Sequence, residues 1–197
     1  MRLIEACAAI AAARDGRAIV ATMGAMRAFD QLQCNDGRMS SVPLMGGAAS
    51  LGLGLALARP EIGVIVVDGD ASLLMQLGGL ASVTDAAPKN FIHFVAHNGA
   101  QFTGNFNLAI PAERCIDFPG LARAAGYRRV ESFSDEASLR AALPALLAAE
   151  GPSFVELRVQ SEPSRFGPEM TQPEMPDLQF SRMGTEATAL AGWYQAR

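Results

Sequence analysis

The sequence predicts an α/β protein: a single three-layer α/β/α domain around a parallel sheet, followed by an irregular C-terminal tail. Three observations support this fold class. The chain has 197 residues, 50% of them hydrophobic, which is enough to form the core of one domain. Apolar, β-branched runs alternate with Ala- and Leu-rich stretches, the pattern of strand–helix units. Every crossover between predicted strands contains a candidate helix.

The first predicted element is a helix. Residues 1–13 contain an Ala run with Glu5 inside it, which is typical of a helix rather than of an export signal. The first strand is predicted at residues 18–21. A Gly- and Ala-rich helix is predicted at residues 48–58, and it stops before Pro60 because a residue that precedes proline is disfavoured in the helical conformation.

Two nearly continuous apolar runs, residues 63–67 and 91–96, predict the central strands. Such runs are expected where helices cover both faces of a parallel sheet. A helix at residues 72–86 is predicted to connect the two strands. It starts at a small polar residue and ends before Pro88.

The last predicted elements complete the sheet. A short helix at residues 121–125 ends at Gly126, and a strand follows at residues 127–130. A longer helix at residues 135–150 has Ser134 as its predicted N-cap and a glycine directly after its end. The final strand is predicted at residues 153–159.

A change in composition divides the chain into a folded domain, residues 1–160, and a tail, residues 161–197. The tail combines prolines, which interrupt regular structure, with methionines that follow no clear period: Pro163, Pro168, Pro173 and Pro176, and Met170, Met175 and Met183. Two interpretations stay open, a loosely ordered terminus and a segment that packs on the domain or on a partner subunit.

Charge and cysteine content exclude several classes of function. Sixteen Lys and Arg against 20 Asp and Glu give a net charge of −4 with no basic run, which argues against nucleic acid and membrane partners. No apolar stretch approaches the ~20 residues that a membrane span requires. Cys7, Cys34 and Cys115 form no C-x-x-C pair, so we expect reduced thiols and a cytoplasmic protein.

Polar residues at the ends of the two central strands form the most informative pattern. Asp68-Gly69-Asp70 directly follows one strand, and Asn98 follows the next, 28 residues after Asp70. Carboxyl ends of neighbouring parallel strands meet at one sheet edge, where a helix N-terminus favours an anion. A carboxylate beside a phosphate requires a cation between them, and these oxygens suit Mg²⁺. The alternative is a pair of ordinary strand-ending turns.

These residues resemble the fingerprint of the diphosphate-binding domain of thiamine diphosphate enzymes. In that family a G-D-G motif is followed some 25 to 30 residues later by an Asn-containing turn, which here reads Gly69-Asp70-Ala71 and Asn98-Gly99-Ala100. The resemblance covers about residues 1–160. It is greatest to sulfopyruvate decarboxylase β subunits and to the C-terminal region of phosphonopyruvate decarboxylases.

The resemblance implies a set of site residues. Asp70, Asn98 and the carbonyl of Ala100 are expected to bind Mg²⁺, with phosphate oxygens and water completing its coordination. The third fingerprint position is Ala71 instead of Gly, and because a Cβ at positive φ would cost roughly 1 kcal/mol or more, we expect Ala71 to have negative φ. Further expected cofactor contacts are Gly69, Ala71, Ser72 and Phe102, the last within a candidate flap at residues 101–105.

The same resemblance gives a role to the loop at residues 42–47. Relatives place a bulky apolar residue there, which wedges between the two cofactor rings and bends the cofactor, and Met45 aligns with it. The carbonyl of Pro43 would accept a hydrogen bond from the cofactor amino group. Without the resemblance, Met45 would be read as ordinary core packing.

The implied function is that of a thiamine diphosphate- and Mg²⁺-binding subunit of a 2-oxo acid decarboxylase. The carboxylate that activates the pyrimidine ring comes from a separate domain in this family, and Glu5 and Glu61 are not well placed for that role. We therefore expect a partner subunit with a pyrimidine-binding domain, in a hetero-oligomer or homo-oligomer, and a chain that is inactive alone. A small 2-oxo acid is the expected substrate.

Three alternatives remain at this point. Gly52-Leu53-Gly54 hints at a dinucleotide-binding fingerprint, but it lies inside a predicted helix and precedes the strand that it should follow. Ala71 and His97 would also suit a non-catalytic subunit that kept the fold. The third alternative is another thiamine diphosphate lyase or carboligase. Residues 22–26 and His93 are each open between a site role and a structural one.

Overall fold

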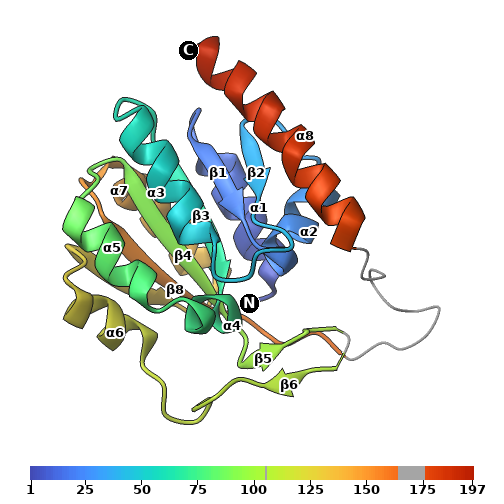
Figure 1. The fold of residues 1–197 in the computed structure, drawn as a ribbon. Helices are drawn as coiled ribbons and strands as arrows, with labels where there is room; N and C mark the ends of the chain where they lie inside the picture. Colours follow the sequence, from blue (N-terminus) through green and yellow to red (C-terminus); the bar gives the residue numbers. More distant parts are fainter. Residues whose placement is uncertain (105, 164–175) are drawn as a thin grey trace.

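The computed structural model describes residues 1–104, 106–163 and 176–197, and helices alternate with strands along most of this length (Figure 1). The elements, in chain order, are α1 (Leu3–Ala13), β1 (Ala18–Ala21), α2 (Met23–Gln31), β2 (Arg38–Ser40), α3 (Ala48–Ala58), β3 (Val64–Gly69), α4 (Asp70–Met75), α5 (Gly78–Ala86), β4 (Phe91–His97), β5 (Ala100–Gln101), β6 (Leu108–Ala109), α6 (Phe118–Ala125), β7 (Arg129–Phe133), α7 (Glu136–Ala148), β8 (Ser153–Arg158) and α8 (Pro176–Gln195).

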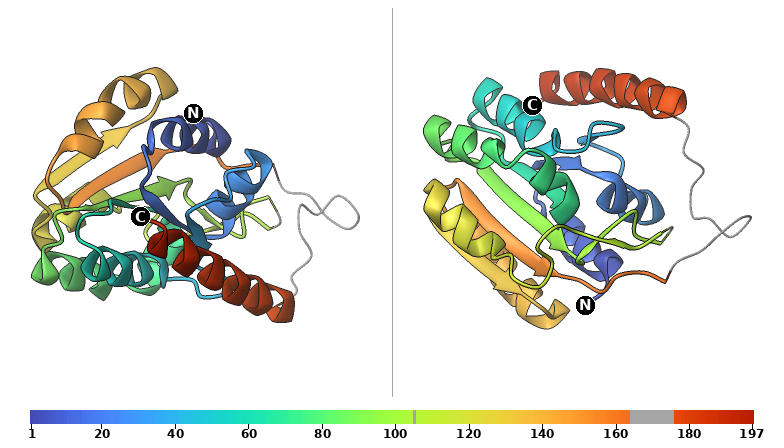
Figure 2. Two further views of the ribbon diagram at one scale, coloured as in Figure 1. Left: turned by 90° about the horizontal axis from the view of Figure 1, so that it is seen from above. Right: turned by 60° about the horizontal axis from the view of Figure 1, so that its bottom comes forward.

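Six parallel strands form the central sheet in the order β2-β1-β3-β4-β8-β7. Helices α1, α2 and α7 pack on one face, and α3, α4, α5 and α6 pack on the other, which makes the three-layer α/β/α domain that the sequence predicts (Figure 2). The register pairs Gly69 of β3 with Ala96 of β4. Asp70 and Asn98 therefore leave the sheet at the same edge.

Alternate residues of the central strands fill two cores, one on each side of the sheet. Ile65 and Val67 of β3 belong to the core under α1, α2 and α7, whereas Val64 and Val66 belong to the core under α3 and α5. All four side chains are fully buried. This explains why the sequence of β3 is apolar without alternation.

Gly52 allows α3 to lie close to β3. A Cβ at this position would be 2.3 Å from Val66 Cγ2, so no larger residue fits without movement of the helix or the strand. The glycine pair that hints at a dinucleotide fingerprint thus lies within α3, where Gly52 serves helix–sheet packing.

Several elements differ from the prediction. The helix expected at residues 72–86 is two helices, α4 and α5, because the chain leaves the helical conformation at Gln76 (φ −143°, ψ 55°). The predicted N-cap Ser134 is wrong, since Asp135 caps α7 by accepting the Ser138 N–H at 2.9 Å. Helix α2 and the three-residue edge strand β2 are not among the predicted elements.

The irregular tail is also wrong for residues 176–195, which form the 20-residue helix α8. Pro176 begins this helix, a position where proline is tolerated because the first helical N–H has no partner within the helix. Met183 lies within α8, whereas Pro168, Met170, Pro173 and Met175 lie outside the described residues. In the described part of the chain, the structure has no helix that is long and apolar enough to cross a membrane.

Helix α8 packs on the β2 edge of the sheet (Figure 1). Its buried residues Leu190, Trp193 and Tyr194 contact Ala18 and Ile62 in a third, smaller core. An ionic network joins the other half of the helix to the domain. Arg182 donates to both carboxylate oxygens of Asp30, and Glu186 accepts the Ser40 N–H of β2 at 2.6 Å.

Candidate cofactor and metal site

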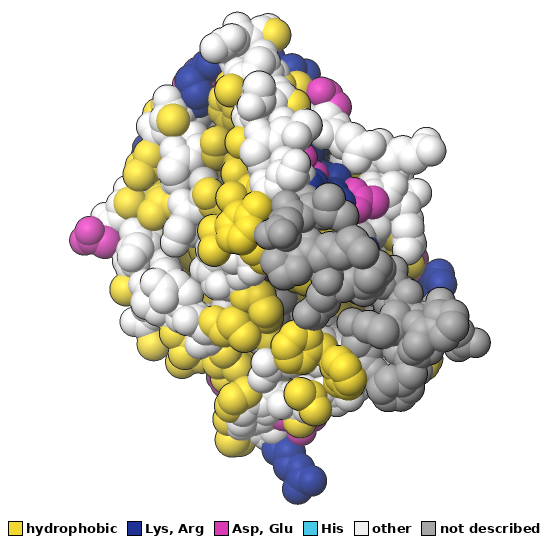
Figure 3. Space-filling view, turned by 45° about the vertical axis from the view of Figure 1, so that its right-hand side comes forward, with side chains coloured by type: hydrophobic (Ala, Val, Ile, Leu, Met, Phe, Trp, Pro, Cys, Tyr) yellow, Lys and Arg dark blue, Asp and Glu magenta, His cyan; other side chains and the backbone are white. Residues whose placement is uncertain are grey.

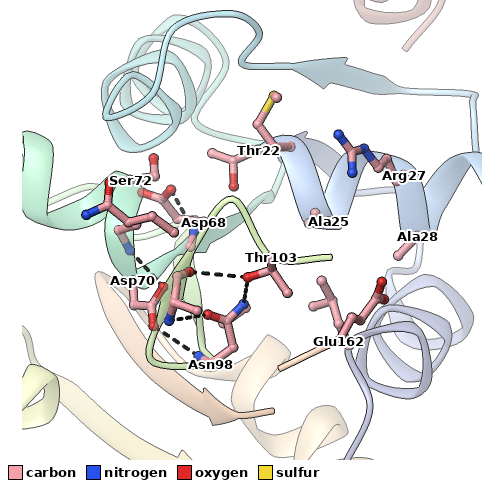
Figure 4. A pocket seen from close by; sticks show the side chains of 18 of the residues that line it. Thr22, Ala25, Arg27, Ala28, Asp68, Asp70, Ser72, Asn98, Thr103 and Glu162 are labelled. Carbon is pink, nitrogen blue, oxygen red and sulfur yellow. Dashed lines mark hydrogen bonds between the residues drawn. The ribbon is translucent and has the colours of Figure 1, made fainter. Parts of the chain in front are cut away.

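An open pocket of about 170 Å³ lies at the carboxyl edge of the sheet, between α2, the start of α4 and the turn after β4 (Figure 4). Most of the residues that the sequence singles out line this pocket: Met45, Gly69, Asp70, Ala71, Ser72, Asn98, Ala100 and Phe102. Pro43 does not line it. Residues from three separate segments of the sequence thus meet in one cavity.

Asp70 is the first residue of α4 and is buried, with 2% of its surface exposed. Its Oδ1 accepts the Ala71 N–H at 2.7 Å, and its Oδ2 accepts the N–H groups of Asn98 at 3.0 Å and Gly99 at 2.7 Å. Burial raises the pKa of Asp70, against the lowering effect of these N–H groups and of His97. A nearby cation would stabilise the buried carboxylate.

Asn98 and its turn supply the second half of the site. Asn98 Oδ1 accepts the Ala100 N–H at 2.8 Å, and Nδ2 donates to Thr103 Oγ1 at 2.8 Å. Thr103 Oγ1 in turn donates to the Ala100 carbonyl at 3.2 Å. These hydrogen bonds fix the side chain and the backbone of the turn opposite Asp70.

The oxygens present fit a hard divalent ion. One carboxylate, one amide oxygen and one backbone carbonyl lie in the same pocket wall, and such oxygens are the ligands that Mg²⁺ uses together with water and phosphate. Among the described residues, no three His, Cys, Asp or Glu side chains gather as a metal cluster. This donor set therefore suits Mg²⁺ shared with a phosphate better than zinc.

Ala71 and Ser72 have different roles in the first turn of α4. Ala71 lies inside the helix and is absent from the described residues with positive φ, so the expected negative φ is confirmed. Ser72 Oγ accepts the Gly46 N–H at 2.8 Å. This bond connects α4 to the loop that carries Met45.

Met45 and Pro43 differ in position, because Met45 lines the pocket and Pro43 does not. Met45 is half-buried, lines the pocket and packs against the core under α3. The Pro43 carbonyl accepts the Met45 N–H at 3.1 Å within the loop. Gly46 follows with a φ of +85°, a conformation that glycine adopts readily.

The candidate flap, residues 101–105, begins at Gln101, the last residue of β5, which pairs with β6 in a small antiparallel ribbon. Phe102 lies just after β5 with a φ of +51°, and its side chain lines the pocket while remaining 42% exposed. Residue 105, the last of the predicted flap, lies outside the described residues.

Asp68 lies in the pocket wall in front of two buried polar residues. Asp68 Oδ1 accepts the Gly69 N–H at 2.8 Å, and Oδ2 is 3.5 Å from His93 Nε2. His93 Nδ1 lies 3.3 Å from the hydroxyl of Tyr127. His93 is fully buried and does not line the pocket, which favours the structural interpretation of this residue.

His97 does not line the pocket and contacts Glu156. Its Nδ1 is 2.7 Å from Glu156 Oε1, and its ring packs edge-on against Phe118 at 4.9 Å between centroids. Glu156 is fully buried and also accepts hydrogen bonds from Ser132 and Arg158. This cluster could not be predicted from local sequence, because its members come from the three strands β4, β7 and β8.

Residues 22–25, part of the segment that the sequence leaves open between a site role and a structural one, line the pocket. The rest of this wall, formed by α1, the later part of α2 and the segment after β8, was not singled out from the sequence. Its side chains include Leu3, Ile4, Arg27, Gln31, Gln160 and Glu162. The available signal was the helical spacing of Gly24, Arg27, Ala28 and Gln31, which places these residues on one face of α2.

The fold and this site define a class of protein. A buried carboxylate at a helix start faces an Asn-containing turn across neighbouring parallel strands, an arrangement suited to a diphosphate held through a metal ion. Residues 20–157 match the family model described as "Thiamine pyrophosphate enzyme, C-terminal TPP binding domain". The chain belongs to this family.

Curated relatives agree with this assignment. The chain is 37% identical over 147 residues to a phosphonopyruvate decarboxylase of Streptomyces viridochromogenes, covering 75% of this chain and 36% of that protein. It is 35% identical over 116 residues to the sulfopyruvate decarboxylase subunit beta of Methanothermobacter thermautotrophicus, covering 59% and 58% of the two chains. The chain thus spans about a third of the length of the first relative and about three fifths of the length of the second.

Solved structures support the fold. A putative thiamin diphosphate-dependent enzyme from Mycobacterium smegmatis superposes with a TM-score of 0.69 at 17% identity, covering 81% of this chain and 32% of that one. The thiamine diphosphate-dependent 4-hydroxybenzoylformate decarboxylase of Rhodococcus jostii RHA1 gives 0.64 at 20% identity, with 82% and 33% covered.

Proposed function

We propose that this chain is the thiamine diphosphate- and Mg²⁺-binding subunit of a 2-oxo acid decarboxylase. The observation that carries the proposal is the meeting of Asp70 with the Asn98 turn in one pocket. The names of the curated relatives, phosphonopyruvate decarboxylase and sulfopyruvate decarboxylase, support the reaction class.

Each group in the pocket then has a defined task. Asp70, Asn98 Oδ1 and the Ala100 carbonyl would hold Mg²⁺, and Ser72 and the N–H groups at the start of α4 would face the diphosphate. Met45 would fix the bent shape of the cofactor. When bound, thiamine diphosphate supplies a nucleophilic carbon that adds to the oxo group and accepts the electron pair released as CO₂ leaves.

The proposal includes a partner subunit that provides the carboxylate for the pyrimidine ring. Glu5 and Glu61 are engaged elsewhere, Glu5 with Arg2 and Glu61 with Arg59. Large apolar side chains are exposed close in sequence to the pocket residues: Leu44, Met75 at the end of α4, Leu77 and Phe102. Hydrophobic side chains gather on the face of the molecule shown in Figure 3. A partner subunit would cover such a surface.

The rival interpretation as a non-catalytic subunit rests on Ala71 and His97. Because Ala71 adopts helical angles in α4, its Cβ imposes no backbone strain at the fingerprint position. This observation favours a site that still binds the cofactor. A lyase and a carboligase would be distinguished by the product released from the assembled enzyme.

Calorimetric titration of the assembled enzyme with thiamine diphosphate and Mg²⁺ tests the proposal. Asp70→Asn removes the negative charge with little change of shape, and we expect Mg²⁺-dependent affinity to fall by a factor on the order of 100 or more. Asp85→Asn, on the exposed face of α5, is the matched control and should bind normally. Unchanged affinity in Asp70→Asn would exclude the metal role.

A further inference from the structure

The charged side chains of the pocket are unevenly distributed. Asp68 and Asp70 lie at the end where β3 leaves the sheet, whereas Arg27 and Glu162 lie across the pocket from Asp70 (Figure 4). Arg27 is the one cationic side chain among the described lining residues. The pocket thus has an end suited to a metal ion and another with a guanidinium group.

Helix α2 fixes the position from which Arg27 reaches the pocket. Its neighbours Met26 and Phe29 are fully buried in the core that α2 shares with α1 and the sheet. Arg27 itself is half-buried, and Gln31 follows it on the same face one turn later. The packed helix therefore fixes the backbone position from which the Arg27 side chain extends into the pocket.

We propose that Arg27 is a specificity-determining residue that binds an anionic substituent, a sulfonate or a phosphonate, at the far end of the 2-oxo acid. This inference rests on the proposed function. A planar guanidinium can donate two parallel hydrogen bonds to such an oxyanion, and the amides of Gln31 and Gln160 provide further donors on the same wall.

The cofactor diphosphate is the other oxyanion that Arg27 could bind. The expected diphosphate position is beside Asp70, Asn98 and the start of α4, across the pocket from Arg27. We therefore assign the substrate substituent to Arg27. Glu162 also lines this part of the pocket, and its negative charge opposes the binding of an anion there.

Steady-state kinetics of the assembled enzyme tests the assignment. The ratio of kcat/KM for sulfopyruvate or phosphonopyruvate to kcat/KM for pyruvate should fall on the order of 10- to 100-fold in Arg27→Gln. Arg27→Lys keeps the charge but loses the paired donors, so it should show a smaller loss. Arg123→Gln, exposed on α6 at the other face of the sheet, should keep the ratio.

A second variant and a binding measurement complete the design. Glu162→Gln should raise the same ratio, because it removes a like charge. Sulfoacetate should inhibit the wild-type enzyme more strongly than acetate does, and Arg27→Gln should abolish this difference. Thiamine diphosphate affinity, measured by calorimetry, should stay unchanged in Arg27→Gln.

The possible outcomes separate the two proposals. An unchanged ratio in Arg27→Gln, or lost cofactor affinity with the ratio preserved, would overturn the assignment of Arg27. A wild-type enzyme that decarboxylates pyruvate as well as the anionic substrates would also overturn it. An assembled enzyme that binds no thiamine diphosphate and decarboxylates none of these acids would instead overturn the proposed function.

Discussion

Glu156 is a fully buried carboxylate in the middle of β8. Burial raises its pKa, but hydrogen bonds from His97, Ser132 and Arg158 outweigh burial and lower the pKa to about 2. Since the pKa in the folded state lies below the ordinary value of 4.5, the ionised group stabilises the fold above pH 4.5. This stabilisation is lost as the pH falls toward 2.

Glu156→Gln should therefore reduce the free energy of unfolding at pH 7 by roughly 3 kcal/mol. The free energy of unfolding of this variant should also change less with pH between 4.5 and 2 than that of the wild type. Urea unfolding at pH 7 and pH 3 measures both effects. Glu131→Gln is the matched control, because Glu131 is half-exposed on neighbouring β7 and pairs with Arg129, a contact worth at most about 1 kcal/mol. Equal losses in the two variants would contradict the prediction.

Met45→Ala should lower kcat by about tenfold or more while changing thiamine diphosphate affinity less than about threefold, because a wedge acts on cofactor shape. Kinetics and calorimetry on the assembled enzyme measure the two quantities. Met183→Ala on α8, outside the pocket, is the control. A normal kcat in Met45→Ala would leave Met45 as core packing.

The proximity of Asp70 and Asn98 could be predicted because each directly follows a central strand, and neighbouring parallel strands bring their ends together. Arg27 and Glu156 could not be found in this way. Arg27 reaches the pocket from within α2, and the contacts of Glu156 depend on the order of β4, β8 and β7 in the sheet. Local sequence does not encode these long-range neighbours.

Among the helices, α8 joins the domain through aromatic packing. The Trp193 side chain is buried, donates to Asp36 Oδ2 at 3.0 Å and lies so close to Gly37 that a Cβ there would be 2.7 Å from its ring. The indole thus fits directly against the loop before β2. Helix α8 covers the edge strand that would otherwise expose unpaired backbone groups.

Trp193→Ala should lower the free energy of unfolding by about 3 kcal/mol, because it removes a large buried ring and leaves a cavity. Thermal and urea unfolding measure the loss. Phe180→Ala is the control on the same helix, since Phe180 is 52% exposed, and it should change stability by about 0.5 kcal/mol or less. Similar stability of Trp193→Ala and wild type would show that α8 contributes little to the fold.

At the level of elements, the five longer strands of the sheet could be predicted from the sequence, and the clearest signal is the nearly continuous apolar run of β3 and of β4. The exceptions have physical causes. The edge strand β2 has only three residues and includes Arg38, so no apolar run marks it. Helix α8 follows a proline-rich stretch, where the prolines predict a break, whereas Pro176 starts a helix.

As a whole molecule, the chain has a pocket open to the surface and exposed apolar side chains close in sequence to the pocket residues. We expect the isolated chain neither to decarboxylate 2-oxo acids nor to bind thiamine diphosphate tightly. Addition of the proposed pyrimidine-domain subunit should produce both decarboxylation and tight binding of thiamine diphosphate. Assays with and without that subunit, together with light scattering of the mixture, measure the effect, and full activity of the isolated chain would refute it.

The hydrogen bonds that Asp70 accepts join the start of α4 to the turn after β4 through contacts within the chain itself. Preorganised backbone loses little conformational entropy when it captures a metal ion and an anion. For the Mg²⁺ site proposed above, the rate of capture should then depend on how fast the ion sheds its hydration water rather than on loop ordering, since Mg²⁺ dehydrates reluctantly.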